Sequence, residues 1–468
     1  MNQTVWGKIS DLVLKHDYCC GCGVCAAVCA SGALEMHFNE NGEYRPYLTG
    51  KCTNCGLCGN VCPFMDGNAN EDELSKHLFA DVPNIKHKVE TGYYLDTFVG
   101  HVDDHNARLN SASGGMATWL LNKLISEKAV DYVLCVSSNN APDQLFGYKV
   151  CINAEAVRSC GGSCYYPVTT QDVLSFVSEN DGRYAVVGLP CVCKAIRLAQ
   201  NQSKKLRSRI KYLVGLVCGQ TKSKFFVEYI CAIAGGDPHR LSKVRFRVKD
   251  VLRPANDFGL KYTCGDGGGA FTEEGTIFWT NGMNDTWTER HFTPNACNFC
   301  DDIFAECADV VFMDAWLPEY RQDWRGHSMA LCRKSEISEL LQNRSNVRIK
   351  EIPIEKVIKS QWGVCKAKRR DLSYRLFKAN SQGKAAPVKR IQPSNTTIHF
   401  LNRLRVCCLG NISEASPINW VAAGKDYLQY NLLMKKLLNK MAVINKIYII
   451  LLYPYILLNY VKKIFKKN

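Results

Sequence analysis

Two cysteine-rich runs, CCGCGVCAAVC at residues 19–29 and CTNCGLCGNVC at residues 52–62, share the spacing C-x2-C-x2-C-x3-C. Three thiolates at positions i, i+3 and i+6 of a tight loop can hold one face of a 4Fe-4S cluster, and a cysteine from elsewhere must reach the fourth iron. Gly21, Gly23 and Gly56 suit the positive φ angles that such a loop needs, and they leave amides free to face sulfide. The doubled run therefore predicts a domain that holds two 4Fe-4S clusters.

This spacing resembles that of bacterial two-cluster ferredoxins, in which the fourth cysteine of each run crosses to the other cluster. The resemblance implies two ligand sets, namely Cys19, Cys22, Cys25 and Cys62 for the first cluster, and Cys52, Cys55, Cys58 and Cys29 for the second. Structural zinc and disulfides are the alternatives, but a structural zinc site takes four ligands in two pairs. Ala30 stands where a proline usually follows the fourth cysteine, and Cys20 is an extra thiol. Neither departure removes a ligand.

The length and composition of the chain are those of a globular protein with several domains. A chain of 468 residues predicts two to four domains, and 46% hydrophobic residues are ordinary for a globular protein with a full core. The 25 cysteines point to a reducing compartment, because several of them, such as Cys135, Cys151, Cys231, Cys264 and Cys332, are scattered singly, as buried small hydrophobic residues usually are. Residues 1–17 lack the apolar core of a signal peptide. We therefore expect a cytoplasmic protein.

Positive charge is concentrated at one end of the chain. Residues 366–468 hold twenty lysines and arginines against three acidic residues, whereas the whole chain has a net charge of +15. The first 365 residues are therefore nearly neutral. A nucleic-acid-binding protein would carry its basic residues on the folded body with aromatic residues between them, so no nucleic acid is expected as a partner.

Hydrophobic patterning divides the chain into five parts. Alternating residues on both sides of a turn at 39–42 predict a hairpin within the 4Fe-4S domain. From residue 92 onward, apolar strands alternate with amphipathic helices, which is typical of a mixed α/β layer with a buried sheet. The expected order is a 4Fe-4S domain (1–66), a linker (67–91), the mixed α/β domain (92–365), a basic linker (366–420) and a basic amphipathic tail (421–468). The fold class is α+β.

Four further cysteines stand out in the second domain. Cys191 and Cys218 directly follow apolar strands, and Cys297 and Cys300 form a C-x2-C pair. A thiol between a buried strand and a helix lies where α/β sheets present ligands, and a helix amino terminus favours the thiolate. Residue chemistry alone leaves two readings open: a further cluster with four ligands, or packed cysteines with one zinc-type pair.

Several short fragments in this domain carry a resemblance when they are taken in order. They are SASGG (111–115), GSCY (162–165), GLPC (188–191), VCG (217–219), FRVK (246–249), CNFC (297–300) and CADV (307–310). Together they resemble the family of coenzyme F420 hydrogenase/dehydrogenase beta subunits, whose members combine a flavin with iron–sulfur clusters. With the cysteine runs in front, about 70% of the chain resembles the family.

The resemblance implies a third 4Fe-4S cluster on Cys191, Cys218, Cys297 and Cys300. It also implies FAD near two loops and a basic strand, and the expected contacts are Ser113, Gly114, Gly115, Gly162, Ser163, Tyr165, Arg247 and Lys249. A Ser-Gly-Gly loop before a helix is a plausible pyrophosphate cradle, although such loops are also common turns. The basic strand could equally be solvated. Cys164 stands where the family pattern has a lysine, and residues 253–256 depart from the usual continuation of the basic strand.

The expected function is an iron–sulfur flavoprotein oxidoreductase, because a flavin links two-electron hydride carriers to one-electron clusters. Coenzyme F420 or another hydride carrier is the expected small partner, and a ferredoxin is the expected protein partner. The catalytic residues stay unassigned, with His291, His327 and Asp314 as candidates. Two alternatives remain, namely an electron-transfer adaptor without its own substrate, and a membrane-docked, ferredoxin-dependent reductase of a glycan or lipid-linked precursor.

The pattern of residues 427–448 predicts a basic amphipathic helix, and the end of this helix overlaps the start of the uncharged run 447–461. That run is shorter than the roughly 20 residues of a spanning helix, and Pro454 interrupts it. We expect the tail to lie in the membrane interface, at the inner face, with its lysines on anionic lipid. The alternative is a helix packed on a partner protein.

Overall fold

The first 66 residues form a ferredoxin-like unit. The computed structural model describes residues 5–465 except 142, 266–271 and 343–345, so Lys466 and Lys467 of the predicted tail lie outside the described residues. The elements of the unit are α1 (Val5–Ile9), the π-helix η1 (Ser10–Leu14), α2 (Val24–Ala27), β1 (Leu34–Phe38), β2 (Tyr44–Leu48) and α3 (Leu57–Asn60). The strands β1 and β2 pair antiparallel, which confirms the predicted hairpin. Gly23 and Gly56 directly precede α2 and α3 with φ of 81° and 82°, as the cysteine loops require.

The second domain is built on an eight-stranded mixed sheet. Its order is β15 (Val347–Glu351), β5 (Thr97–Val102), β14 (Ser328–Cys332), β13 (Val310–Asp314), β9 (Ile210–Leu216), β8 (Tyr184–Gly188), β6 (Tyr132–Ala141) and β7 (Gln144–Cys151). The central strands β13, β9, β8 and β6 run parallel, and the strands on both sides of them pair antiparallel. Central strands covered on both faces explain the continuous apolar runs in the sequence.

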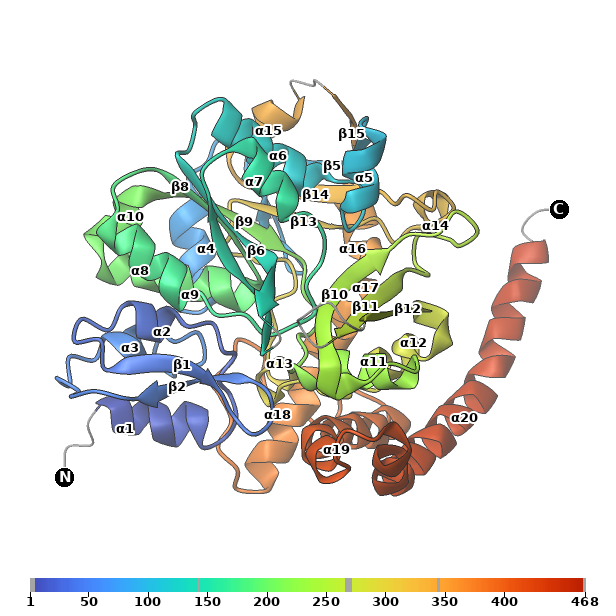
Figure 1. Ribbon diagram of the computed structural model, residues 1–468. Coiled ribbons are helices and arrows are strands. Elements are labelled where there is room, and N and C mark those ends of the chain that lie inside the picture. Colours follow the sequence, from blue (N-terminus) through green and yellow to red (C-terminus); the bar gives the residue numbers. More distant parts are fainter. Residues whose placement is uncertain (1–4, 142, 266–271, 343–345, 466–468) are drawn as a thin grey trace.

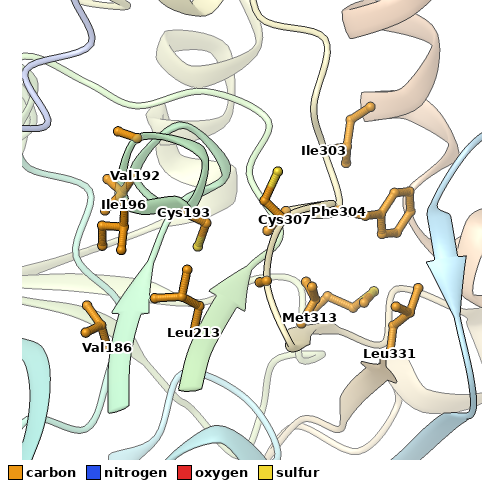
Figure 2. Packing of buried hydrophobic residues seen from close by; sticks show 14 of the residues in the cluster. Val186, Val192, Cys193, Ile196, Leu213, Ile303, Phe304, Cys307, Met313 and Leu331 are labelled. Carbon is orange, nitrogen blue, oxygen red and sulfur yellow. The ribbon is translucent and has the colours of Figure 1, made fainter. Parts of the chain in front are cut away.

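Helices cover both faces of this sheet (Figure 1). One face carries α6 (Met116–Ser126), α7 (Ala154–Ser159) and α15 (Ser335–Gln342). The other carries α4 (Glu71–Phe79), α8 (Gln171–Glu179), α9 (Pro190–Gln202), α10 (Lys204–Arg209), α16 (Ile354–Ser360) and α17 (Trp362–Cys365). Figure 2 shows the core on this second face, where Val192, Cys193 and Ile196 of α9 pack over Val186 and Leu213. Cys22, Val24 and Val61 of the ferredoxin-like unit belong to the same core, so that unit is docked on the α9 side.

A smaller sheet lies beside the large one. Its strands, in order, are β10 (Leu241–Val248), β11 (Gly259–Gly265) and β12 (Thr272–Phe278). It packs with α11 (Phe225–Ile233) and α12 (Met283–Thr288) in a separate apolar core. The remaining short elements are β3 (Lys86–Lys88), β4 (Gly92–Tyr94), α5 (His105–Asn110), η2 (Pro238–Arg240), η3 (Trp279–Asn281), α13 (Asn295–Asn298) and α14 (Pro318–Arg321).

The basic segment 366–420 differs from the linker that the sequence predicted. It contains η4 (Lys366–Arg370), α18 (Asp371–Ser381) and the long helix α19 (Phe400–Ala422). Leu372 and Leu376 of α18 are buried against Ile9 and Val13 of the ferredoxin-like unit. The segment 67–91 likewise holds α4, whose capping box at Asn70 and Glu73 fixes its first turn. Both segments are held in a defined structure by apolar contacts with the rest of the protein. The sequence analysis judged them by their charges and prolines, which do not reveal such contacts.

The tail forms one helix, α20 (Tyr427–Phe465), that continues through Pro454, where the sequence predicted an interruption. A proline removes one backbone hydrogen bond, and here the helix continues past it. The first half of α20 packs on α19 and α11, and the helix then extends away from the other elements (Figure 1). Tyr430, Met434 and Met441 are buried in this contact, so part of the predicted membrane-facing side is covered by the protein. Among the helices that the structure describes, none is both long and apolar enough to cross a bilayer.

Candidate functional site

The cysteines of the ferredoxin-like unit gather in two groups. Cys25 lies within electrostatic reach of Cys19 and Cys62, and Cys22 of Cys19 and Cys25. In the second set, Cys58 lies within electrostatic reach of Cys29, Cys52 and Cys55, and these four cysteines line one cavity. Backbone amides already donate to two of these sulfurs, from Gly21 to Cys19 at 3.4 Å and from Asn54 to Cys52 at 3.4 Å. In each group the fourth cysteine of one run lies with the first three of the other.

The four cysteines of the second domain converge although they are far apart in sequence. Cys191 is near the start of α9, Cys218 follows β9, Cys297 is on α13, and Cys300 lies just after it. Cys218 interacts electrostatically with the other three. Burial raises the pKa of both Cys218 and Cys300. These sulfurs therefore need nearby positive charge, from a metal or a side chain, to exist as thiolates.

Two residues at this group were missed by the sequence analysis. Lys368 is buried, and its ammonium donates to Cys300 Sγ at 3.0 Å and to the carbonyl oxygen of Asp302 at 3.0 Å. Burial lowers the pKa of Lys368, but the neighbouring sulfurs outweigh it and raise the pKa above its usual range. Cys20, noted only as an extra thiol, hydrogen-bonds both Cys22 and Cys191 and so lies between the two cysteine groups. Its adjacency to Cys19 was the only signal for this position.

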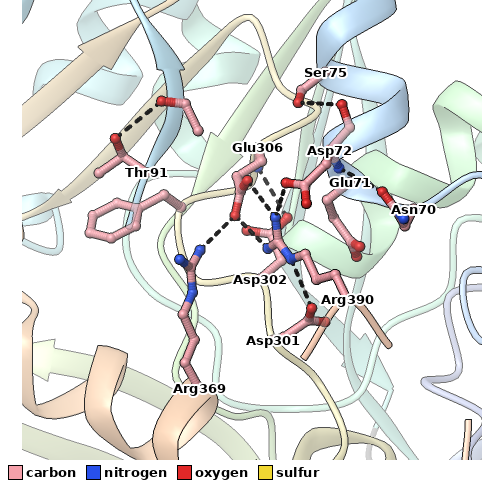
Figure 3. Close-up of polar contacts among 12 residues, drawn as sticks. Asn70, Glu71, Asp72, Ser75, Thr91, Asp301, Asp302, Glu306, Arg369 and Arg390 are labelled. Atoms are coloured by element: carbon pink, nitrogen blue, oxygen red, sulfur yellow. Dashed lines mark hydrogen bonds and ion pairs between the residues drawn. The ribbon is translucent and has the colours of Figure 1, made fainter. Parts of the chain in front are cut away.

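A buried ion network lies on the acidic residues of the segment 301–306, which directly follows Cys300 in the chain (Figure 3). Arg390 donates to Asp301 at 2.9 Å and to Glu306 at 2.6 and 2.8 Å, and Arg369 donates to Glu306 at 2.9 Å. The two carboxylates are almost fully buried. Burial and the neighbouring Glu306 raise the pKa of Asp302 to about 7. Arginines from the predicted basic linker thus neutralise the acidic loop that follows the C-x2-C pair.

The expected flavin loop at Ser113 is closely packed. Ser113, Gly114 and Gly115 are buried, and a Cβ on Gly114 would meet the backbone of β5 and β14 at 2.5 and 2.6 Å. The close approach of strands therefore accounts for Gly114 without any phosphate. Val102 N–H donates to the Gly114 carbonyl, and beside Val102 lies a cavity of about 170 Å³ that is lined by His101, Val102, Asp103, His105, Arg108, Arg325 and Arg348.

The second expected loop meets the basic strand at an aromatic group. Tyr165 packs on Phe246 and on Trp287, with ring centroids 5.1 and 4.9 Å apart, and its hydroxyl hydrogen-bonds Ser163 and Arg247. Gly162 is exposed in this loop. The structure thus brings Arg247 to Ser163 and Tyr165, which lie more than 80 residues earlier in the chain, although the contacts of these three residues are with one another.

Arg247 has an unusual backbone. It lies in the left-handed region with φ of 61°, at a bulge where β10 shifts its register against β11. A non-glycine residue rarely adopts this conformation, and bulges commonly redirect a side chain near a functional site. Arg247 is directed at Asp314, with its guanidinium 3.8 Å from the Phe258 ring centroid and 5.0 Å from that of Trp316.

Lys249 connects the basic strand to the Ser113 loop. Its ammonium donates to the carbonyl oxygens of Ser113 at 2.8 Å, Arg108 at 2.6 Å and Arg325 at 2.6 Å. Burial, followed by the charges of Arg247 and Arg108, lowers the pKa of Lys249 to about 7. Three carbonyl acceptors need three N–H donors, so the ammonium form is the one that satisfies this contact.

The candidate acid–base residues fall in different environments. His291 is buried among aromatic rings and bonds the Tyr430 hydroxyl at 2.5 Å, which makes it part of the contact with α20. His327 lies beside the Ser113 loop, where burial and the charge of Arg108 lower its pKa to about 4. Asp314 is paired with Arg247. Only His327 and Asp314 are therefore near the expected flavin contacts.

Family models match three parts of the chain. Residues 18–65 match a 4Fe-4S dicluster domain. Residues 97–175 match the N-terminal part, and residues 181–357 the C-terminal part, of the coenzyme F420 hydrogenase/dehydrogenase beta subunit. The ferredoxin-like unit is also 38% identical, over 53 residues, to an uncharacterized ferredoxin of Methanocaldococcus jannaschii; the match covers 11% of this chain and 69% of that protein. The predicted 4Fe-4S domain is thus confirmed.

Curated relatives are more distant. One of the subunits of the F420H2 dehydrogenase of Methanosarcina mazei is 26% identical over 221 residues, which cover 45% of this chain and 56% of the relative. The coenzyme F420-dependent sulfite reductase of Methanocaldococcus jannaschii is 23% identical over 367 residues, which cover 74% of this chain and 49% of the relative. The chain thus spans about half the length of these two relatives.

A solved structure, of the F420-reducing nickel–iron hydrogenase complex from Methanosarcina barkeri, matches with a TM-score of 0.49 and 16% identity; the match covers 65% of this chain and 98% of that chain. The two family models together match more than half of this chain, in the order that the sequence motifs indicated. The chain therefore belongs to the family of coenzyme F420 hydrogenase/dehydrogenase beta subunits.

Proposed function

We propose that this chain is an iron–sulfur flavoprotein oxidoreductase subunit that passes electrons between a hydride carrier or reducible substrate, FAD and three 4Fe-4S clusters. The hydride carrier is coenzyme F420 or a molecule of similar chemistry, and the one-electron partner is a protein such as ferredoxin. Cys191, Cys218, Cys297 and Cys300 hold the third cluster in this proposal. A bound flavin supplies the exchange between hydride transfer and single electrons.

The convergence of the four distant cysteines carries this proposal. They come from a helix start, a strand end and a C-x2-C pair, and their group lies against the ferredoxin-like unit through Cys20. Thr221 donates its backbone N–H to Cys297 Sγ at 3.3 Å, as amides do at cluster ligands. Donor chemistry and surroundings therefore fit a 4Fe-4S cluster.

The aromatic group supports the flavin part of the proposal. Tyr165 and Trp287 are only partly buried and offer flat apolar surface, and Arg247 lies beside Tyr165. Gln220 donates to the Trp287 carbonyl oxygen at 2.8 Å, and the next residue, Thr221, contacts Cys297. The aromatic group and the cysteine group are thus joined by two adjacent residues. The cavity beside Arg108 offers cationic side chains for a phosphate.

Anaerobic purification followed by iron, sulfide and flavin quantitation on one sample tests the proposal. Three clusters and one flavin require about twelve iron atoms and one FAD per chain. About eight iron atoms and no flavin would leave only the ferredoxin-like unit active in electron transfer. Turnover with reduced coenzyme F420 and an artificial one-electron acceptor then separates an enzyme from an adaptor, because an adaptor shows no turnover without its partner.

Replacing Lys368 tests the electrostatics of the third cluster. We expect Lys368→Met to lower the midpoint potential of one cluster. In the wild type the charge-assisted hydrogen bond from Lys368 stabilises the reduced, more negative form of the cluster, and the variant loses this bond. A contribution of about 1.5–3 kcal/mol corresponds to roughly 65–130 mV for one electron. Redox titration followed by electron paramagnetic resonance measures the change. Lys366→Met, two residues away and exposed, is the control. An equal potential in both variants would contradict the role of Lys368.

The exposed side of α20 favours a membrane-docked form of this function. Leu432, Val443 and Ile450 are 61%, 55% and 67% exposed, and their spacing of eleven and seven residues puts them on one helix face. Lys436 and Lys446 flank this face and are exposed. Apolar residues beside lysines suit an anionic lipid surface. The reductase of a lipid-linked or glycan precursor is therefore the second candidate function.

Glutamate substitutions on this face test membrane contact. We expect the double variant Leu432→Glu/Ile450→Glu to lose cosedimentation with phosphatidylserine-containing vesicles, because each change removes apolar contact and adds a repelled charge. Truncation of the whole tail is less informative, since Tyr430 and Met434 are buried in the body. Leu252→Glu is the matched control, because Leu252 is 90% exposed outside the tail. Equal cosedimentation of all three proteins would exclude lipid binding by α20.

A further inference from the structure

Three cysteines with no part in the proposed relay come together on the sheet face opposite to the ferredoxin-like unit. Cys135 is on β6, Cys151 ends β7, and Cys160 follows α7 directly. The sulfur of Cys151 lies 3.7 Å from that of Cys135 and 3.6 Å from that of Cys160. All three sulfurs lie within 4.8 Å of one another.

Strand pairing and a short helix produce this group. Cys151 pairs with Val133 across β6 and β7, and because side chains alternate along a strand, Cys135 lies on the same face as Cys151. Asn153 caps α7 by accepting from Ala156 N–H, which turns the chain back over that face and brings Cys160 to the two strand cysteines. Residues from three elements therefore fix the positions of the sulfurs.

The spacing suits a metal ion. A tetrahedral zinc with Zn–S bonds of about 2.3 Å separates its sulfurs by roughly 3.8 Å. A disulfide needs sulfurs about 2.05 Å apart, so these thiols are at ligand distance and not at bond distance. Cys135 and Cys151 are buried, whereas Cys160 is only partly buried, which leaves an approach from its side. Lys149 pairs with Cys135 across the strands and adds positive charge next to the thiolates.

We propose that Cys135, Cys151 and Cys160 bind one zinc ion, with a water molecule in the fourth coordination position. Binding releases the thiol protons and changes no oxidation state. Zinc at this position ties the end of α7 to the sheet, immediately before the loop at Gly161 and Gly162. The zinc would thereby help to position Ser163 and Tyr165, and this role rests on the proposed flavin site. The binding of zinc does not depend on that site.

Metal analysis of the anaerobically purified, fully iron-loaded chain tests the site. We expect one zinc per chain in the wild type, with three sulfur neighbours at about 2.3 Å in zinc-edge X-ray absorption. Cys151→Ser should lower zinc at least tenfold and leave iron unchanged. Cys332→Ser is the matched control, because Cys332 is buried in the same apolar core and should keep both metals.

The outcomes separate this site from the cluster cysteines. Zinc retained by a folded Cys151→Ser variant would place the zinc elsewhere in the chain and overturn the proposal. A wild type that neither contains zinc nor takes it up from a chromophoric zinc chelator would also overturn it, as would a disulfide among the three cysteines. If Cys151→Ser fails to fold, the wild-type absorption spectrum decides, since a shell of nitrogen and oxygen neighbours excludes a three-cysteine site. Flavin content is independent of these readouts.

Discussion

Arg390→Met is expected to destabilise the protein by about 3–5 kcal/mol, because it leaves the buried carboxylates of Asp301 and Glu306 without their main partner. Lys389 and Arg369 still face these carboxylates, at 3.5 and 2.9 Å, so the lower end of this range is expected. Anaerobic guanidinium unfolding followed by circular dichroism measures the change as a lower midpoint relative to the wild type.

Arg348→Met is the control for this prediction. Arg348 also forms an ion pair, with Asp103 at 2.7 Å, but its side chain is 78% exposed. Exposed pairs contribute between zero and about 1 kcal/mol, because water and salt screen the charges. A similar midpoint for both variants would mean that the buried network at residues 301–306 contributes no more than a surface contact does.

If Cys191 is a ligand of the proposed third cluster, Cys191→Ala is expected to remove that cluster and lower the iron content from about twelve to about eight atoms per chain. The loss follows because Cys191 is the only member of the four-cysteine group on α9, and a cubane that loses one thiolate ligand exposes an iron to solvent. Iron and sulfide quantitation measures the change, and flavin should be retained because the Tyr165 group does not contain Cys191. Retention of twelve iron atoms would exclude Cys191 as a ligand.

Cys193→Ala makes the same change two residues further along α9. Its side chain is fully buried in the apolar core beside Val192 and Ile196 (Figure 2), and it has no place in the proposed ligand set. Cys193 is the more deeply buried of the two, so its replacement should cost at least as much packing as that of Cys191. A difference in iron content between them therefore reports ligation and not loss of fold. Equal iron loss in both would point to damage of α9 itself.

Local signals predicted much of this protein. Ligand spacing within eleven residues indicated each cysteine run, and alternation over six residues indicated the β1–β2 hairpin, because both depend only on neighbours along the chain. Apolar runs indicated the buried strands of the large sheet for the same reason. The order of short fragments indicated the family, which the family models confirm.

Segments whose structure depends on distant partners were predicted less well. The basic residues of 366–420 indicated a linker, yet Lys368 contacts Cys300 and Arg390 contacts Glu306 inside the protein. A count of charge cannot show that carboxylates elsewhere are buried and need a cation. The apolar residues of the tail were likewise predicted to face the membrane together. In the structure Met441 is buried against the rest of the protein, whereas Leu432 is exposed.

The sequence by itself determined the cysteine spacing and the alternation of strands and helices, because these depend on residues close together in the chain, and the order of its short fragments indicated the family. The family resemblance implied the ligand sets of the clusters, but only the tertiary structure decided that Cys20 and Lys368 lie at the third group and that Cys160 meets Cys135 and Cys151. Cys191, Cys218 and Cys300 converge, Cys20 joins them, and Cys160 reaches the strand cysteines because strand pairing and helix packing close loops of very different length. Such closure depends on the packing of the whole core, which no local pattern encodes.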